Sequence, residues 1–94
     1  MKVWTILDNC DGDTFVYVRG TEKWAYWCAF DLISNSVLPV RSTYEGDERY
    51  SKLLEAIDAD DHVATVKEYN ESHQGYSIEV EEHDISEWME DVEE

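Results

Sequence analysis

The first nineteen residues have a pattern that predicts a β-hairpin. Residues 3–7 and 14–19 are rich in β-branched and aromatic side chains, and residues 8–13 between them have the sequence Asp-Asn-Cys-Asp-Gly-Asp. Asp, Asn and Gly favour tight turns, whereas β-branched and aromatic residues favour strands. We therefore expect two antiparallel strands joined by a short turn.

Residues 24–33 are apolar on both alternating faces, which makes this segment the hardest to assign. Its aromatic content favours a central strand that is covered on both sides. Thr21 supports the alternative, a helix that begins here with Thr21 as its N-cap, and periodicity does not separate the two for a run this apolar. Residues 37–44 are predicted to form a further strand, at a sheet edge because Pro39 lacks the amide hydrogen that a ladder requires.

Helical spacing appears at residues 47–57. Asp47 and Glu48 lie near the start, where negative charge complements the helix dipole. The apolar face of this predicted helix consists of Tyr50, Leu53, Leu54 and Ile57.

A second hairpin is predicted from residues 63–69 and 76–82, with its turn at residues 70–75. Strict alternation in the second strand predicts one core-facing side and one side lined with carboxylates. The core side consists of Tyr76, Ile78 and Val80, and the other side of Ser77, Glu79 and Glu81.

The last residues of the chain predict an amphipathic helix. Residues 84–87 resemble a capping box in which Asp84 replaces the usual Ser or Thr. Apolar residues recur at i, i+3, i+4 and i+7, namely Ile85, Trp88, Met89 and Val92. Together these elements predict an α+β fold of order ββββαββα, with an antiparallel sheet of about five to six strands and one or two helices.

Composition supports one folded unit spanning residues 1–94. Of its residues 43% are hydrophobic, and twelve are Trp, Tyr or Phe, which is sufficient for a modest core. No stretch approaches the roughly 20 apolar residues of a membrane helix, and the N-terminus lacks the features of a secretory signal. Cys10 and Cys28 lack CxxC spacing, so we expect free thiols, with a disulfide as the alternative. We therefore expect a cytoplasmic protein.

The negative charge is concentrated in the second half of the chain. Residues 45–94 contain eighteen acidic and three basic side chains, a net charge of −15, whereas residues 1–44 have a net charge of −1. Such a surface attracts cationic partners and repels nucleic acid and anionic membranes, so direct binding to either is not expected. The charge leaves the oligomeric state open, and a dimer is compatible with it.

The spacing of the late carboxylates predicts a mimic of nucleic-acid phosphates. Residues two apart on a strand are about 6.6 Å apart. Neighbours on the predicted last helix are about 5–6 Å apart. Both spacings are comparable to those of successive phosphates, so the array fits a groove of Lys and Arg. The alternatives are a solvating acidic surface and adaptation to high salt, although the near-neutral first half disfavours the latter. The candidate partner-binding residues are Glu68, Glu71, Glu79, Glu81, Glu87, Glu90, Asp91 and Glu94.

No motif predicts catalysis, a metal or a cofactor. The loop at residues 8–13 does not fit an EF-hand, because aligning Gly12 at position 6 places Leu7 at position 1 and Val18 at position 12. The three histidines lack zinc-site spacing and are expected at strand ends or in loops. The chain is therefore not expected to be an enzyme.

Several aromatic side chains are candidates for surface contacts. Trp and Tyr dominate the hot spots of protein interfaces, and we expect Trp27 or Tyr26 to be exposed. Tyr44, Tyr50 and Tyr69 flank acidic segments and are candidate anchors at the rim of the charged face.

In size, acidity and α+β pattern the chain resembles small phage inhibitors of host nucleic-acid enzymes, which include anti-restriction, anti-CRISPR and uracil-glycosylase-inhibiting proteins. The resemblance is compositional and transfers no functional residue. It implies a non-enzymatic inhibitor that blocks a basic nucleic-acid-binding groove. The alternative is an acidic adaptor or chaperone-like module for a basic protein, without nucleic-acid mimicry.

Overall fold

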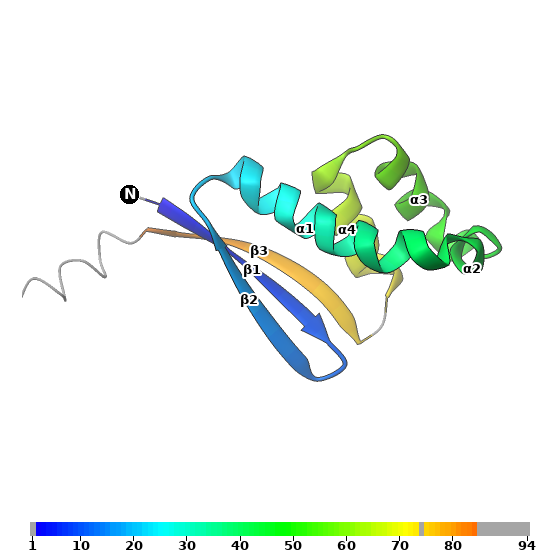
Figure 1. Cartoon of the computed structure of the whole chain (residues 1–94), viewed down its shortest axis with the longest axis horizontal. Helices are drawn as coiled ribbons and strands as arrows, with labels where there is room; N and C mark the ends of the chain where they lie inside the picture. Colours follow the sequence, from blue (N-terminus) through cyan, green and yellow to red (C-terminus); the bar gives the residue numbers. More distant parts are fainter. Residues whose placement is uncertain (1, 74, 85–94) are drawn as a thin grey trace, which may run out of the picture.

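The computed structural model describes residues 2–73 and 75–84, which form a three-stranded sheet with helices on one side (Figure 1). The α+β class is confirmed, but the predicted sheet of five to six strands with one or two helices is wrong, because the described residues form three strands and a larger number of helices. The predicted C-terminal helix lies outside the described residues. In chain order the elements are β1 (Lys2–Cys10), β2 (Asp13–Arg19), α1 (Glu22–Val37), α2 (Arg41–Glu45), α3 (Ser51–Asp58), α4 (His62–Ser72) and β3 (Tyr76–Asp84), with short 3₁₀ turns at Leu38–Val40 and Glu48–Tyr50.

The sheet has the order β2-β1-β3 and is antiparallel throughout. The predicted N-terminal hairpin is confirmed as β1 and β2. Its two-residue turn has positive φ at both positions, 47° at Asp11 and 91° at Gly12. A turn of this kind matches the right-handed twist of the flanking strands, and Asp and Gly tolerate its backbone conformation.

The two faces of the sheet have different surroundings. Ile6 in β1 is fully buried, so even-numbered residues of β1 face the helices and odd-numbered residues face the other way. In Figure 1, α1 and α4 lie along one side of the sheet. No element of the described residues covers the second side, which we call the open face. It carries Val3, Thr5, Leu7, Asn9, Thr14, Val16, Val18, Ser77, Glu79, Glu81 and His83.

Residues 24–33 belong to helix α1, so the favoured strand prediction is wrong and the Thr21 alternative is right. The Thr21 hydroxyl accepts a hydrogen bond of 3.2 Å from the Trp24 amide. Ala25 and Ala29 are fully buried one turn apart, and their small side chains let the helix approach the sheet closely. Packing of this face therefore overrides the strand preference of the aromatic residues.

Two other predicted strands are helical. Residues 37–44 comprise the last residue of α1, a 3₁₀ turn and most of α2. Pro39 lies in the first turn of the 3₁₀ segment, where its missing amide hydrogen leaves no helical bond unmade. Residues 63–69 lie in α4, which begins where the Asp61 carboxylate accepts a hydrogen bond from the Ala64 amide. The strand predicted at residues 76–82 is confirmed as β3, but it pairs with β1 instead of with residues 63–69.

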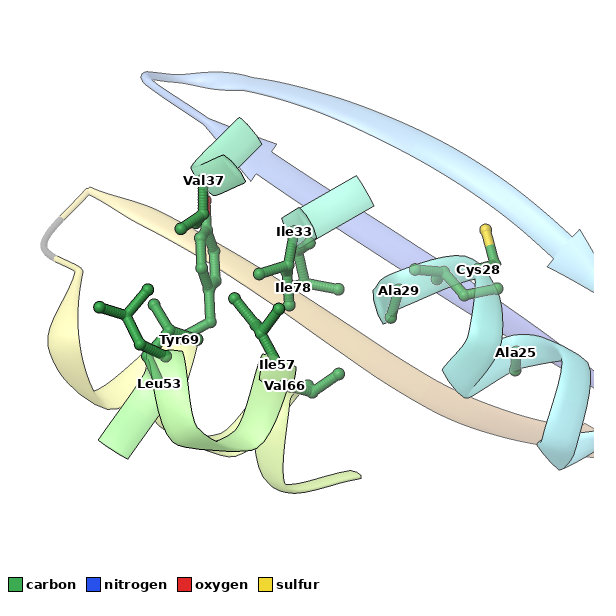
Figure 2. Close-up of a cluster of buried hydrophobic side chains, with 12 residues drawn as sticks. Ala25, Cys28, Ala29, Ile33, Val37, Leu53, Ile57, Val66, Tyr69 and Ile78 are labelled. Atoms are coloured by element: carbon green, nitrogen blue, oxygen red, sulfur yellow. The ribbon is translucent and has the colours of Figure 1, made fainter. Parts of the chain in front are cut away.

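The core lies between the helices and the sheet. Figure 2 shows Ile33 of α1, Ile57 of α3, Val66 and Tyr69 of α4 and Ile78 of β3 directed toward one another. The helix predicted at residues 47–57 is confirmed in α3 and the 3₁₀ turn before it, and its predicted apolar residues Leu53, Leu54 and Ile57 are buried.

Candidate functional site

Strand β3 carries the most exposed row of the predicted carboxylates. Glu79 and Glu81 are exposed on the open face, opposite Leu7 and Thr5 of β1. On the helix side Ile78 is 2% exposed and Val80 packs against the core, as the alternation predicts, whereas Tyr76, also predicted for the core, is 39% exposed. Because β3 is hydrogen-bonded to β1 along its whole length, the backbone positions of Glu79 and Glu81 are fixed, about 6.6 Å apart along the strand.

Glu68 and Glu71 do not join this row. Both lie on α4, and the sheet separates them from the open face. They line a hollow of about 320 Å³ together with Arg49, Lys52 and Ser72, and Arg49 itself forms an ion pair of 2.7 Å with Asp47. The predicted set is therefore divided between two regions, and Glu87, Glu90, Asp91 and Glu94 lie outside the described residues.

Several other acids pair with the few cations of the chain. Arg41 donates two hydrogen bonds of 2.8 and 2.7 Å to Asp58 and one of 3.1 Å to Glu45. The pKa of the Asp58 carboxyl is lowered by its hydrogen bonds from Arg41. Lys2 forms an ion pair of 2.6 Å with Glu82 on the helix side of β3. Within the described part of the chain no ion pair involves Glu79, so its charge is unpaired on the open face.

The remainder of the open face is polar at one end and apolar along β2. The Asn9 amide donates to the Ser77 hydroxyl at 3.1 Å and accepts from the Thr14 hydroxyl at 2.8 Å, which links the three strands. Val16 and Val18 of β2 are 59% and 54% exposed. The face thus carries carboxylates at one edge and an apolar strip at the other.

At the other end of β3, His83 links the acidic row to β1. Its Nε2 lies 2.9 Å from the Thr5 hydroxyl and 3.7 Å from a carboxylate oxygen of Glu81. The imidazole is therefore part of the open face and lies within reach of any partner that contacts Glu81.

A second hollow lies on the helix side, where the chain brings together groups that are distant in sequence. Its volume is about 320 Å³, and burial raises the pKa of its Asp8 carboxyl. Burial, reinforced by the nearby Asp8 charge, raises the pKa of Tyr69 to about 12. No hydrogen bond joins the Asp8 carboxylate to any residue in 2–73 or 75–84, so this group is able to accept one from a cation. The lining residues are Asp8, Cys10, Ser36, Tyr44, Tyr69, His73 and Tyr76.

This hollow lacks the geometry of a nucleophilic site. The Nε2 atom of His73 is 3.1 Å from the Tyr44 hydroxyl, and its Nδ1 is 3.1 Å from both the Tyr69 carbonyl and the Ser72 hydroxyl. With both ring nitrogens engaged, the imidazole is not free to activate Cys10. Cys10 and Cys28 are free thiols, and burial raises the pKa of Cys28.

The histidines and the turn acids form no metal site in the part of the chain that the structure describes. His62 begins α4 instead of lying in a loop, and its ring packs on Phe30 with centroids 4.4 Å apart. His73 immediately follows the last residue of α4, and His83 lies near the end of β3, as expected.

The aromatic predictions have mixed outcomes. Trp27 is exposed as expected and contacts Trp24 edge to face, with ring centroids 6.1 Å apart. Tyr69 is buried on the core side of α4, so its proposed position at the rim of the charged face is wrong. Tyr44 and Tyr50 are half-buried and pack on each other and on His73.

Comparisons with protein-family models, with curated proteins and with solved structures found no match for this chain. No helix among the described residues has both the length and the apolar character needed to cross a membrane.

Proposed function

We propose that the chain is a non-enzymatic inhibitor whose open face binds a Lys/Arg-rich groove of a nucleic-acid-binding protein. The observation that carries the proposal is the exposed row of Glu79 and Glu81 on a hydrogen-bonded strand, beside a sheet face that no described element covers. Carboxylates held at about 6.6 Å on a rigid strand resemble successive phosphates of one nucleic-acid strand. We place the chain in the class of phage anti-defence proteins, of the anti-CRISPR or anti-restriction kind, acting in the cytoplasm of the host.

The net charge of −16 supports recognition of a cationic surface. Long-range attraction accelerates encounter with such a surface, and release of ions on contact makes the affinity fall steeply with salt. Glu79 is well suited to this role, because no described cation neutralises it.

The apolar strip on the same face favours a second candidate, an adaptor for a basic protein without nucleic-acid mimicry. Val16 and Val18 are exposed side chains that have no counterpart on a phosphate backbone. They suit a shaped protein surface, where apolar contacts at the centre of an interface dominate the affinity. Competition by DNA distinguishes the two functions, because only a mimic shares its groove with nucleic acid.

The proposal is tested by inhibition of purified nucleic-acid enzymes from the three inhibitor classes: restriction endonucleases, CRISPR effector complexes and uracil-DNA glycosylase. DNA binding by each enzyme is measured by gel shift with increasing amounts of the chain. We expect inhibition of at least one enzyme, relieved by excess DNA and by raising the salt concentration. Inhibition that DNA does not relieve supports the adaptor instead.

The double variant Glu79→Lys with Glu81→Lys tests the site itself. We expect it to lose at least about tenfold in affinity for the inhibited enzyme, since each reversal replaces attraction with repulsion. The matched control is Glu68→Lys with Glu71→Lys, which changes the net charge equally on α4. Equal losses in the two double variants would show that total charge, and not the β3 row, carries the binding.

A further inference from the structure

Among residues 2–73 and 75–84, no strand pairs with the outer backbone edge of β2. The Asn70 amide group bonds both backbone groups of Ile78 on the outer edge of β3, so those groups point away from β1. Ile78 pairs with Asp8, and alternation along an antiparallel ladder then directs Asp8 toward its other neighbour, Phe15. The backbone groups of the alternate β2 residues Thr14, Val16 and Val18 consequently point outward.

Side chains leave this edge accessible and apolar. Val16 and Val18 are exposed on the open face, and Phe15 is 53% exposed on the other face. An exposed apolar edge strand is a template for pairing with a further strand. The hydrogen bond between Arg19 Nη1 and the Val18 carbonyl, 2.8 Å long, partly shields this edge in the single chain.

We propose that β2 pairs with β2 of a second copy in antiparallel orientation, about a two-fold axis at Val16. Val16 then lies opposite the partner's Val16, and Thr14 opposite the partner's Val18. All three are residues whose backbone groups point outward, so the register completes a hydrogen-bonded ladder. Symmetric pairing of identical surfaces is the commonest arrangement of protein dimers.

Side chains along β2 are complementary in this register. Asp13 lies opposite the partner's Arg19, and the same ion pair recurs across the axis. Phe15 lies opposite the partner's Tyr17, and cross-strand aromatic pairs of this kind stabilise sheets. The Arg19 guanidinium leaves the Val18 carbonyl to meet the partner's Asp13, and the carbonyl accepts a hydrogen bond from the partner's Thr14 instead.

The distribution of charge permits this contact. Residues 1–44, which include β2, have a net charge of −1, whereas residues 45–94 have a net charge of −15. The near-neutral part of each copy thus meets its counterpart, while the acidic parts lie farther apart. The six-stranded sheet places the Glu79 and Glu81 rows of the two copies at its opposite edges, about 24 Å apart at five interstrand spacings.

Charge reversal tests the register, with sedimentation velocity reporting the dimer over roughly 1 µM to 1 mM. The single variants Asp13→Arg and Arg19→Asp should each weaken dimerisation about tenfold, because each creates two like-charged contacts. The double variant Asp13→Arg with Arg19→Asp should restore it. The two residues are six positions apart on one strand, about 20 Å, so rescue within a single chain is excluded.

Cysteine crosslinking provides a second measurement that does not depend on charge. In a Cys10→Ser background, Val16→Cys should form an intermolecular disulfide under mild oxidation, because opposed residues at the axis are about 5.5 Å apart at Cα. Val18→Cys should crosslink much more slowly, because its opposite residue is the partner's Thr14. Val16 and Val18 are similarly exposed, which makes them a matched pair.

A variant that disrupts the axis completes the test. Val16→Lys should weaken the dimer at least tenfold by placing two ammonium groups opposite each other. Val63→Lys, on the similarly exposed Val63 of α4, should leave the dimer unchanged. A chain that remains monomeric up to 1 mM, a charge swap that fails to rescue, or equal crosslinking at positions 16 and 18 would each overturn the proposal.

Discussion

The two edge strands of the sheet differ in the hydrogen bonds that their outward-pointing backbone groups form. At β3, Asn70 of α4 donates to the Ile78 carbonyl and accepts from the Ile78 amide, each at 2.8 Å, so the side chain acts as one residue of a further strand. At β2, the side-chain shielding that the described residues provide is one hydrogen bond, from Arg19 to the Val18 carbonyl. The β3 edge is also flanked by carboxylates, which discourage strand pairing, whereas the β2 edge is flanked by valines.

The cause of this difference is the position of the helices. Val66 and Tyr69 of α4 pack in the core with Ile78, which brings Asn70 within hydrogen-bonding distance of β3. Helix α1 packs across β1, and no described helix lies beyond β2. Helix packing thus protects the backbone edge of β3. The same arrangement leaves the edge of β2 available for association.

Truncating one residue at each edge should show the largest contrast. Ile78→Ala removes a side chain that is 2% exposed, and we expect it to lower the free energy of unfolding by about 2–4 kcal/mol. Val16→Ala removes an exposed side chain and should change the free energy of unfolding by less than about 0.5 kcal/mol. Urea unfolding at low protein concentration measures both. Similar losses would contradict the assignment of β2 as an open edge.

Removing the Asn70 side chain that bonds the edge of β3 should have an intermediate effect on the free energy of unfolding. Asn70→Ala deletes two hydrogen bonds to Ile78, and we expect a loss of about 1–2 kcal/mol, moderated because water reaches the edge. The matched control is Asn35→Ala, an exposed asparagine on α1 whose contact with Asp31 is 3.4 Å long. Faster hydrogen exchange at the Ile78 amide in the Asn70 variant would locate the effect at this edge.

Acidification should weaken the fold slightly through His73. Burial lowers the pKa of His73 below its ordinary 6.5, so the folded chain keeps this imidazole neutral where the unfolded chain protonates it. The contribution of His73 to the free energy of unfolding is therefore fully present above pH 6.5, and it is lost as the pH falls toward the lowered pKa. His73→Gln should flatten this part of the pH profile of urea unfolding between about pH 7.5 and 5. An unchanged slope would show that His73 does not titrate differently in the two states.

Local chemistry determined the parts of the fold that the sequence predicted. The Asp11-Gly12 turn specifies the first hairpin through its positive φ angles, and the spacing of Leu53, Leu54 and Ile57 specifies a helix. The alternation around Ile78 placed Glu79 and Glu81 on one exposed face. Each of these signals involves residues close in sequence, so it does not depend on the rest of the fold.

The sequence of β2 carries a further signal of the open apolar edge. Residues 15–18 are apolar on both faces of their strand, which suits a buried central strand. With three strands in the described sheet and helices on one side, three of these residues, Phe15, Val16 and Val18, are exposed instead. The conflict between an all-apolar strand and an edge position indicates an interaction surface, and it appears only once the topology is known.

Tertiary structure alone decided which apolar segments became helices and which residues distant in sequence came into contact. Residues 24–33 and 63–69 have strand-like composition, yet burial of Ala25 and Ala29, and of Val66 and Tyr69, is achieved by helical spacing against the sheet. The closure of β3 by Asn70 likewise depends on contacts between distant residues. By itself the sequence determined the acidic second half, the first hairpin and the carboxylate row of β3, because composition and short-range periodicity are local properties. Long-range packing decided the three-stranded sheet, the open face and the unpaired edge, because those depend on which surfaces the helices cover.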